Sequence, residues 1–202
     1  MKLDIVFSGV GGQGVVVISD IFCEAALIDG FDVAKAEIHG MAQRGGAIVA
    51  HVRIGDKVQA PLIERGTADI VLGFEVLETA RALPMLKEKG AVVVNTKYMP
   101  PYAALASSKP LSQEQLLGMI KEKARAVYEV DGLGIAKKLG NMLVVNTVLL
   151  GALSALPENP VKKASLKKAM ASRLKEEYVE VNLKAFQLGV ESVKFIVFRK
   201  TI

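Results

Sequence analysis

The sequence has few of the residues that carry most redox and acid–base chemistry. In 202 residues it has one cysteine, Cys23, and two histidines, His39 and His51. A single cysteine excludes an intrachain disulfide, and so few ligands exclude a zinc site or an iron–sulfur cluster held by this chain alone. Neither histidine has the nearby serine, cysteine or aspartate of a recognisable nucleophilic triad, so we name no catalytic residue and no metal ligand.

Long hydrophobic runs are also missing. The longest apolar stretch, 142–156, contains Asn146, Thr147 and Ser154, and it is shorter than the roughly 20 residues that a membrane span needs. Residues 1–2 lead directly into a strand-like segment that is too short for the apolar region of a secretory signal. We therefore expect a cytoplasmic protein without a membrane partner.

Aromatic residues make up only 5% of the chain, and there is no excess of acidic residues. The net charge is +5, but the first 100 residues carry −2 and the remainder +7. Much of the basic excess lies in 161–170, where lysines and apolar residues recur at helical spacing. No aromatic residue interleaves with these lysines, so a solvated helix face explains them and we expect no nucleic-acid partner. A basic face also suits an acidic partner subunit.

Glycine, in contrast, is concentrated in two clusters. The first turn consists of Gly9, Gly11, Gly12, Gln13 and Gly14. Three of its glycines have the G-x-G-x-x-G spacing between a strand-like run and a helical segment. Such glycines allow positive φ and let a phosphate approach the amides at the helix start. A tight turn with nothing bound uses the same glycines, so the residues alone leave both interpretations open.

The second turn consists of Gln43, Arg44, Gly45 and Gly46. We expect it to face the first turn and to aim Arg44 at whatever lies there, although a solvated arginine would have the same sequence. Glu37 ends a strand-like segment at the distance where a dinucleotide fold places its ribose-binding acid. Spacing therefore does not exclude an NAD site, but a turn follows Glu37 where that fold would have a helix.

Strand-like and helical segments alternate up to residue 130. Strands are predicted over 3–7, 32–38, 47–54, 68–72, 91–95 and 126–130. Helices are predicted over 12–27, 75–83, 85–89 and 113–123, with a break at Pro84 and a cap at Ser112. This order predicts a three-layer α/β fold with a Rossmann-like, mostly parallel sheet.

Beyond residue 132 only helices are predicted. The last begins at about Glu177, and its apolar residues repeat every 3.5 positions, as in a buried face or a seam for a partner helix. We expect a helical C-terminal extension of one domain spanning 1–202, not a second domain.

Four motifs in this order resemble the gamma-type subunit of 2-oxoacid:ferredoxin oxidoreductases. They are 9–14, 43–46, Leu139-Gly140-Asn141 with Asn146, and 182–189 beginning at Asn182. The resemblance covers nearly the whole chain. The turn over 39–46 is most similar to that of the beta subunits of indolepyruvate:ferredoxin oxidoreductases.

The resemblance implies a subunit of an enzyme that oxidatively decarboxylates a 2-oxoacid, such as an aryl pyruvate, to an acyl-CoA and CO2, with ferredoxin as electron acceptor. Thiamine diphosphate, Mg, iron–sulfur clusters and CoA belong to the holoenzyme, and this chain binds none of them alone. Its partner would be a larger thiamine diphosphate and iron–sulfur subunit, and it would meet ferredoxin through the complex. The sequence leaves open whether the isolated chain self-associates.

The resemblance also implies roles for individual residues. Both turns become ligand or interface sites, and Asn141, Asn146 and Asn182 become further site residues. Glu37 is then expected to anchor the second turn by pairing with Arg44 or with the partner chain.

Two other functions remain open from the residues. A stand-alone NAD-binding oxidoreductase is favoured by the first turn and Glu37, and disfavoured by the absence of a recognisable acid or base. A noncatalytic assembly protein is suggested by the 3.5-residue repeat and by Asn182 on the last helix.

Overall fold

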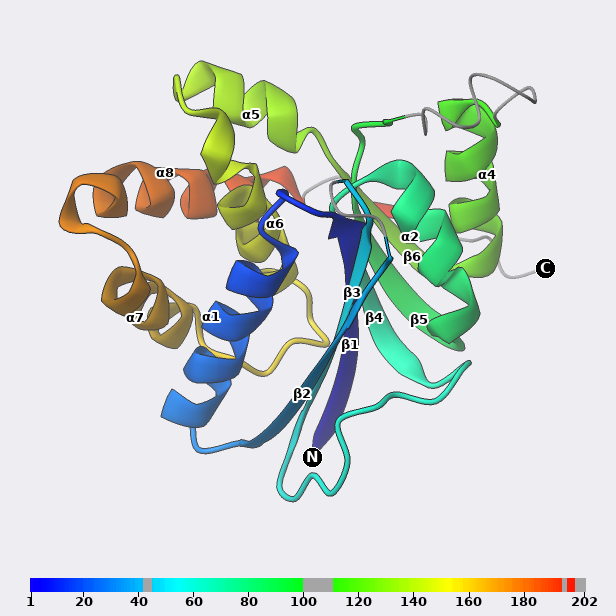
Figure 1. Cartoon of the computed structure of the whole chain (residues 1–202), viewed down its shortest axis with the longest axis horizontal. Coiled ribbons are helices and arrows are strands. Elements are labelled where there is room, and N and C mark those ends of the chain that lie inside the picture. Colours follow the sequence, from blue (N-terminus) through cyan, green and yellow to red (C-terminus); the bar gives the residue numbers. More distant parts are fainter. Residues whose placement is uncertain (42–44, 100–110, 194–195, 199–202) are drawn as a thin grey trace.

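The computed structural model describes residues 1–41, 45–99, 111–193 and 196–198. Its centre is a seven-stranded sheet with the order β2-β3-β1-β4-β5-β6-β7 (Figure 1). The strands are β1 (Lys2–Val10), β2 (Asp32–His39), β3 (Ala47–Gly55), β4 (Ala68–Gly73), β5 (Leu86–Asn95), β6 (Ala126–Val130) and β7 (Ile196–Phe198).

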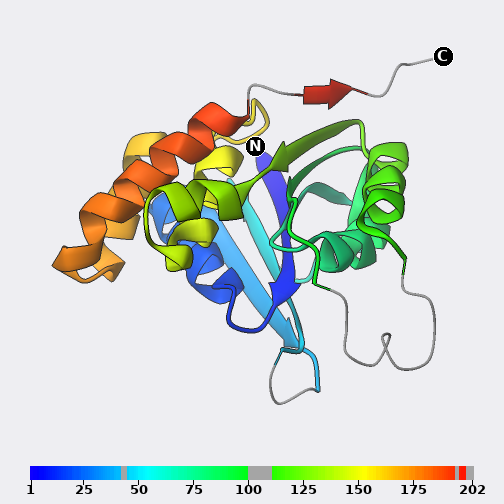
Figure 2. The ribbon, with the colours of Figure 1, turned by 90° about the horizontal axis from the view of Figure 1, so that it is seen from above.

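Helices cover both faces of this sheet. Those of the described residues are α1 (Val15–Ile28), α2 (Val76–Ala82), α4 (Gln113–Lys123), α5 (Gly132–Lys138), α6 (Val145–Ser154), α7 (Lys163–Arg173) and α8 (Glu176–Ser192), with short 3-10 turns over Leu83–Met85 and Met142–Val144. Seen from above, α1 and α5 to α8 lie on one side of the sheet, and α2 and α4 lie on the other (Figure 2). The three-layer α/β fold expected from the sequence is confirmed.

The sheet is parallel in its centre and antiparallel at both ends. β1, β4, β5 and β6 pair in parallel, as expected, whereas β3 pairs antiparallel with both β1 and β2, and β7 pairs antiparallel with β6. The connection between β2 and β3 is too short for a parallel crossover, which needs a dozen or more residues. The two strands therefore form a hairpin, and β3 lies between β1 and β2. The sheet is mixed, with its parallel part confined to four strands.

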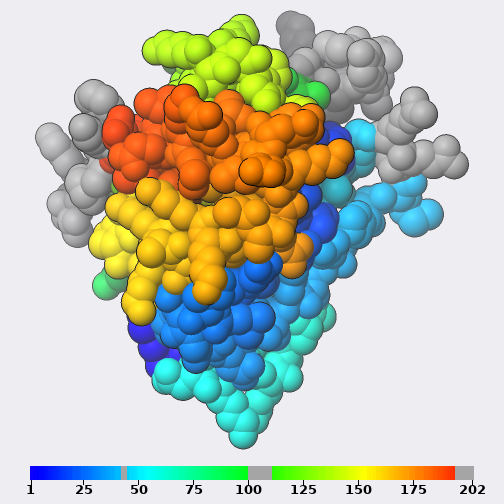
Figure 3. Space-filling model, turned by 90° about the vertical axis from the view of Figure 1, so that its left-hand side faces the viewer, coloured from blue at the N-terminus to red at the C-terminus, as the bar shows by residue number. Residues whose placement is uncertain are grey.

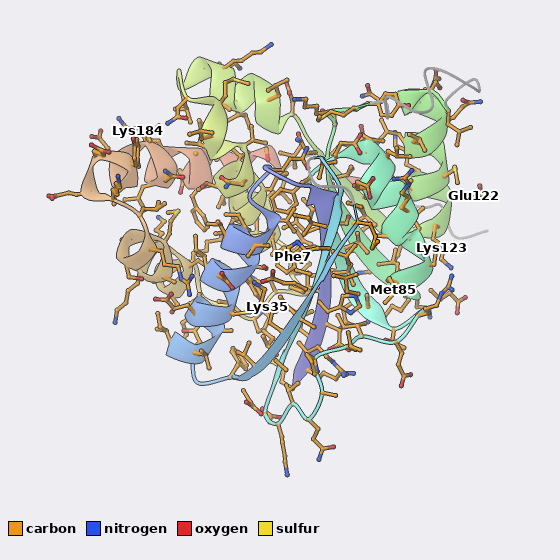
Figure 4. All side chains as sticks on the ribbon, viewed as in Figure 1. Phe7, Lys35, Met85, Glu122, Lys123 and Lys184 are labelled. Carbon is orange, nitrogen blue, oxygen red and sulfur yellow. The ribbon has the colours of Figure 1, made fainter. Side chains whose placement is uncertain are left out.

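The central strands have apolar side chains on both faces because helices cover both. Leu3, Ile5 and Phe7 of β1 face α1, and Val6 faces the side of α2 and α4. The ring centroids of Phe7 and Phe22 are 6.0 Å apart in the layer between β1 and α1 (Figure 4). These near-continuous apolar runs are typical of buried parallel strands.

Most predicted elements are present, and two expectations are wrong: the helix predicted over 85–89 is absent, and beyond residue 132, where only helices were predicted, Ile196–Phe198 forms the strand β7. The helix over Gln113–Lys123 has its predicted cap, where Ser112 accepts from the Gln115 amide and the Gln115 side chain bonds back to the Ser112 amide. In place of the predicted helix over 85–89, Met85 ends a 3-10 turn and β5 begins at Leu86, which pairs with Ala68 across an irregular register. Pairing with β4 determines the structure of this charged segment, which has no apolar period of its own.

The C-terminal helices pack tightly against each other. Figure 3 shows α8 lying across one side of the molecule between α5 and α7. A Cβ added at Gly151 of α6 would overlap the Phe186 carbonyl oxygen of α8, and one added at Gly189 would overlap the Val148 carbonyl oxygen. The backbones of α6 and α8 are therefore in direct contact. The repeating apolar residues of α8, including the fully buried Phe186, pack on the chain's own core.

This contact predicts a stability effect for one methyl group. Gly151→Ala should lower the free energy of unfolding by about 1–3 kcal/mol, because α6 and α8 must move apart to accept the Cβ. Gly118→Ala is the matched control, since a Cβ at this helical glycine of α4 meets no described atom within 4 Å. The control should be stabilising by about 0.5–1 kcal/mol, in keeping with helix propensity. Urea unfolding measures both, and equal stability of the Gly151 variant and the parent would contradict the packing.

Candidate functional site

The carboxyl ends of the parallel strands form one edge of the sheet, where the first glycine turn lies. Gly9, the last residue but one of β1, lies where no side chain fits, because a Cβ there would lie 2.8 Å from the side chains of Val15 and Phe74. Gly12 and Gly14 have φ values of 93° and 81°, which glycine alone adopts routinely. Gly14 is the N-cap of α1 and offers no capping side chain, so the first amides of α1 are available to a ligand or partner.

Gln13 closes this turn from within. Its Oε1 accepts from the Val10 amide at 2.8 Å, and its own amide donates to the Val10 carbonyl at 3.1 Å. Its Nε2 lies 3.7 Å from Met99 Sδ in the segment after β5. The Gln13 side chain therefore holds the turn in shape and joins the ends of β1 and β5.

The second turn meets the first through the backbone. The Gly11 amide donates to the Gly46 carbonyl at 2.9 Å, and Gly45 has a φ of 67°. Gln43 and Arg44 lie outside the described residues. The structure thus brings Gly11, Gly45 and Gly46 together at the tip of the β2–β3 hairpin.

Glu37 lies within a charged cluster on β2. Lys35 Nζ is 2.7 Å from Glu37 Oε1 and 2.5 Å from Asp20 Oδ1 of α1, and His39 Nε2 is 3.0 Å from Glu37 Oε2. Figure 4 shows Lys35 beside α1. Hydrogen bonds from Lys35 and then His39 lower the pKa of Glu37, which keeps its carboxylate charged. The described partners of Glu37 are therefore its neighbours on β2.

The position of β3 also separates Glu37 from the first turn. Phe7 of β1 is opposite Ala50 of β3, which in turn is opposite Glu37 of β2. Glu37 is thus two strand spacings, about 10 Å, from β1. A dinucleotide fold has its acidic strand directly beside the glycine-rich strand, so this arrangement argues against the NAD interpretation.

The three predicted asparagines have two different roles. Asn141 caps the 3-10 turn before α6, where its Oδ1 accepts from the Leu143 amide at 2.9 Å. Asn146 lies against the first turn, because a Cβ at Gly14 would overlap its Nδ2 atom. Asn182 of α8 accepts a hydrogen bond from Thr147, the residue after Asn146, at 2.5 Å. Gly14, Asn146 and Asn182 are therefore linked, whereas Asn141 is a local cap.

Two further polar residues at this edge were missed by sequence reasoning. The buried Glu75 follows β4, and its carboxylate accepts from the Glu78 and Met99 amides at 3.0 and 2.9 Å. Asn95 ends β5, donates to the Phe74 carbonyl at 3.0 Å and accepts from the Gly132 amide at 3.2 Å. Both directly follow buried apolar strands, which is the signal that could have identified them. They join the ends of β4, β5 and β6.

Exposed apolar side chains surround the same edge. Met41 is fully exposed, Leu143 is 80% exposed, and three others are at least 40% exposed. We call this set the apolar rim: Ile38, Met41, Met99, Met142 and Leu143. Its members lie on β2, the hairpin, the segment after β5 and the turn before α6. Clustered exposed apolar residues mark interaction surfaces, and methionines adapt well to a partner.

The side chains best suited to acid–base or nucleophilic chemistry are engaged elsewhere. Burial raises the pKa of the Cys23 thiol to about 12, so it is not a nucleophile at neutral pH. Burial lowers the pKa of His51, whose Nδ1 accepts from the Ile63 amide at 3.0 Å. Within the described ranges, no group of three His, Cys, Asp or Glu side chains is arranged to hold a metal ion.

In the described part of the chain, every helix is too short or too polar to cross a membrane.

A family model described as pyruvate ferredoxin/flavodoxin oxidoreductase matches residues 4–192. The chain is 40% identical to the indolepyruvate oxidoreductase subunit IorB of Methanothermobacter thermautotrophicus, over 94% of this chain and 96% of the relative. Both lengths are covered almost completely, so the similarity extends well beyond the glycine turns.

Solved structures agree with this relationship. The gamma subunit of a keto/oxoacid ferredoxin oxidoreductase from Geobacter sulfurreducens has a TM-score of 0.70 and 30% identity, over 95% of this chain and 98% of that subunit. The fold also occurs in 2-oxoglutarate:ferredoxin oxidoreductase from Magnetococcus marinus, with a TM-score of 0.73 and 23% identity, where it matches 96% of this chain but only 31% of a longer one. On these grounds the chain belongs to the pyruvate ferredoxin/flavodoxin oxidoreductase family, as a gamma-type subunit.

Proposed function

We propose that this chain is the small subunit of an indolepyruvate:ferredoxin oxidoreductase. Family membership supports a subunit of a 2-oxoacid:ferredoxin oxidoreductase and disfavours a stand-alone NAD enzyme or a noncatalytic assembly protein. The single observation that carries the choice of an aryl pyruvate is the end-to-end 40% identity to an indolepyruvate oxidoreductase subunit.

In the proposed reaction, the bond between C1 and C2 of the 2-oxoacid breaks and the carboxylate leaves as CO2. The acyl carbon is oxidised by two electrons, which pass to ferredoxin, and it forms a bond to the CoA sulfur, whose proton is released. Thiamine diphosphate and iron–sulfur clusters supply this chemistry when bound. A single half-buried cysteine and the absence of an acidic or histidine cluster among the described residues do not fit either group. We therefore assign thiamine diphosphate, its Mg and the clusters to a larger subunit.

We infer that the apolar rim is where the larger subunit binds. The rim is exposed in this chain: the Met41 side chain is fully exposed, and Leu143 is 80% exposed. In the Magnetococcus marinus protein, the same fold is about a third of a longer chain, so this fold is compatible with attachment to a larger body. The basic excess of the C-terminal half would complement an acidic partner surface.

We further propose that the first glycine turn contacts the CoA phosphates. The support is geometric: Gly12 and Gly14 keep Cβ atoms away from the turn, and the first amides of α1 have no partner within the helix. The Magnetococcus marinus structure contains coenzyme A, which shows that the fold occurs in a CoA-binding enzyme. Gln43 and Arg44, with Gly45 and Gly46, would complete this site from the second turn.

Other expectations remain predictions. These are a single domain over 1–202, a cytoplasmic complex, contact with ferredoxin only through the larger subunit, and Glu37 as an anchor of the second turn. The self-association of the isolated chain is open.

The division of labour predicts that the isolated chain is inactive. Purified alone and supplied with indolepyruvate, CoA, thiamine diphosphate, Mg²⁺ and oxidised ferredoxin, it should reduce no ferredoxin above background. Co-expression with the larger subunit should restore reduction, measured as ferredoxin bleaching under anaerobic conditions. Turnover by the chain alone would refute the assignment of the redox cofactors to a partner.

The apolar rim predicts a position-dependent effect of charge on assembly. Leu143→Glu should reduce co-purification with the larger subunit at least tenfold, because a buried carboxylate without a partner is costly at an interface. Leu62→Glu is the matched control, since Leu62 is also an exposed leucine but lies in the β3–β4 loop at the opposite edge of the sheet.

Circular dichroism should show both variants folded. If Leu143→Glu assembled as well as Leu62→Glu, the larger subunit would bind elsewhere.

A further inference from the structure

The strand β2 forms one edge of the sheet, and one side of its backbone points away from β3. The Gly40 amide donates to the Ala47 carbonyl at 2.8 Å, which makes these two residues a hydrogen-bonded pair of the β2–β3 hairpin. Such pairs recur at every second residue of an antiparallel ladder, so the even-numbered residues of β2 bond to β3. The other residues direct their amides and carbonyls outward from the sheet: Val33, Lys35, Glu37 and His39.

This edge is open to another strand. In the described part of the chain, β2 packs mainly on β3 and α1. Figure 3 shows β2, in light blue, along the margin of the molecule beside α1. No described residue bonds to the outward amide or carbonyl of Lys35, Glu37 or His39. Of the outward amides, only that of Val33 has a partner, the side chain of Asp32 at 3.0 Å.

β2 also lacks the features with which proteins commonly block an exposed edge. It is eight residues long, contains no proline and pairs with β3 without a bulge. Its one lysine, Lys35, has a side chain that is only 14% exposed, and its Nζ lies 2.7 Å from Glu37 Oε1. Lys35 therefore presents no free charge to an approaching strand.

The order of side chains on β2 matches a second copy of the same strand. When two copies pair antiparallel about a two-fold axis at Ala36, Lys35 of each copy lies opposite Glu37 of the other. Both residues face outward, so each such pair exchanges two backbone hydrogen bonds, and the opposite charges favour the pairing. On the other face of the strand, the exposed Ile38 lies opposite the small Ala34.

Other registers are less favourable, and the helices leave room for this one. With the axis at Lys35 or at Glu37, that residue would lie opposite its own copy, and like charges would meet. The helix α1 contacts β1, β2 and β3, so it lies inward of the edge. With α1 over the middle strand of these three, the two copies of α1 would be three strand spacings, about 14 Å, apart. Packed helices need less than that.

We propose that β2 of one chain pairs antiparallel with β2 of a second copy, in the register that places Lys35 opposite Glu37, so that the two sheets become one. A two-fold contact of this kind uses the same patch on both chains. The pairing goes beyond the proposed function and does not depend on it. It is compatible with the larger subunit, because Met99, Met142 and Leu143 of the apolar rim lie outside β2.

Sedimentation equilibrium of the full chain, over an about hundredfold range of concentration, tests the pairing. The parent chain should be a dimer at the upper end of the range. Glu37→Lys brings lysines opposite each other, and Lys35→Glu brings glutamates opposite each other, so each variant alone should dimerise at least about tenfold more weakly. An equal mixture of the two variants should form a heterodimer, because the lysines of one then face the glutamates of the other.

A second pair of variants tests the backbone hydrogen bonds. Glu37→Pro removes an outward amide that β3 does not use, and proline is tolerated in an edge strand when its nitrogen faces solvent. Glu37→Gln is the matched control, because it also loses the charge but keeps the amide. The proline variant should dimerise at least about tenfold more weakly than the glutamine variant. Circular dichroism and Tm should show both folded.

A parent chain that stays monomeric over the whole range would overturn the proposal. So would a dimer that Glu37→Lys and Glu37→Pro leave unchanged, since another surface would then make it. If the parent were monomeric and Glu37→Pro lost co-purification with the larger subunit, the edge would pair with that subunit and not with a second copy. A dimer with the expected pattern of variants would support the pairing even if the complex turned over no 2-oxoacid, which would overturn only the proposed function.

Discussion

The contact between Gly14 and Asn146 is the constraint on which this edge of the molecule depends. Gly14 starts α1 with a left-handed backbone, and the space that its Cβ would occupy is filled by the Asn146 amide. The first strand–helix unit is thereby joined to α6, which in turn contacts α8 backbone to backbone. Residues 14, 146 and 182 are distant in sequence, yet each limits where the others can lie.

The sheet edge at the carboxyl ends of the parallel strands has buried, hydrogen-bonded polar residues beneath and exposed apolar residues around it. Glu75 and Asn95 are buried and fully engaged with backbone groups, so they fix the ends of the central strands without facing outward. Outside them lie exposed methionines and a leucine, together with the start of α1, whose first amides no side chain among the described residues caps. Such an edge suits a subunit, because its buried polar contacts are made within the chain while its exposed apolar side chains are left for a partner to cover.

The sequence predicted the layers well because their signals are local. A short apolar run such as Val92–Val94 is typical of a strand that helices cover on both faces of the sheet. Ser112 has its capping partner, Gln115, only three residues away. The position of β3 between β1 and β2 was not predicted, because strand order is set by pairing between segments and not by either segment alone. The segment over 85–89 was assigned to a helix for the same reason, since only its pairing with β4 makes it a strand.

For the candidate site, sequence reasoning identified residues more readily than roles. Asn146 and Asn182 came from a family resemblance, but the threonine that joins them is an ordinary residue in an apolar helix and gives no signal of its own. Glu37 had the right sequence spacing for a nucleotide site, but β3 lies between β2 and β1 and separates it from the first turn. Sequence spacing alone does not reveal such an intervening strand.

The inserted hairpin also gives the first glycine turn a closed side and an open side. Within the turn, the amides of Val10, Gly11 and Gln13 already donate to Gln13, Gly46 and Val10. A ligand therefore cannot approach across β3, where the hairpin occupies both the space and the donors. Among the described residues, the neighbours of the turn away from the hairpin are Asn146 of α6, against Gly14, and Met99, against Gln13, so on that side the turn is bordered by side chains and not by a backbone hydrogen bond.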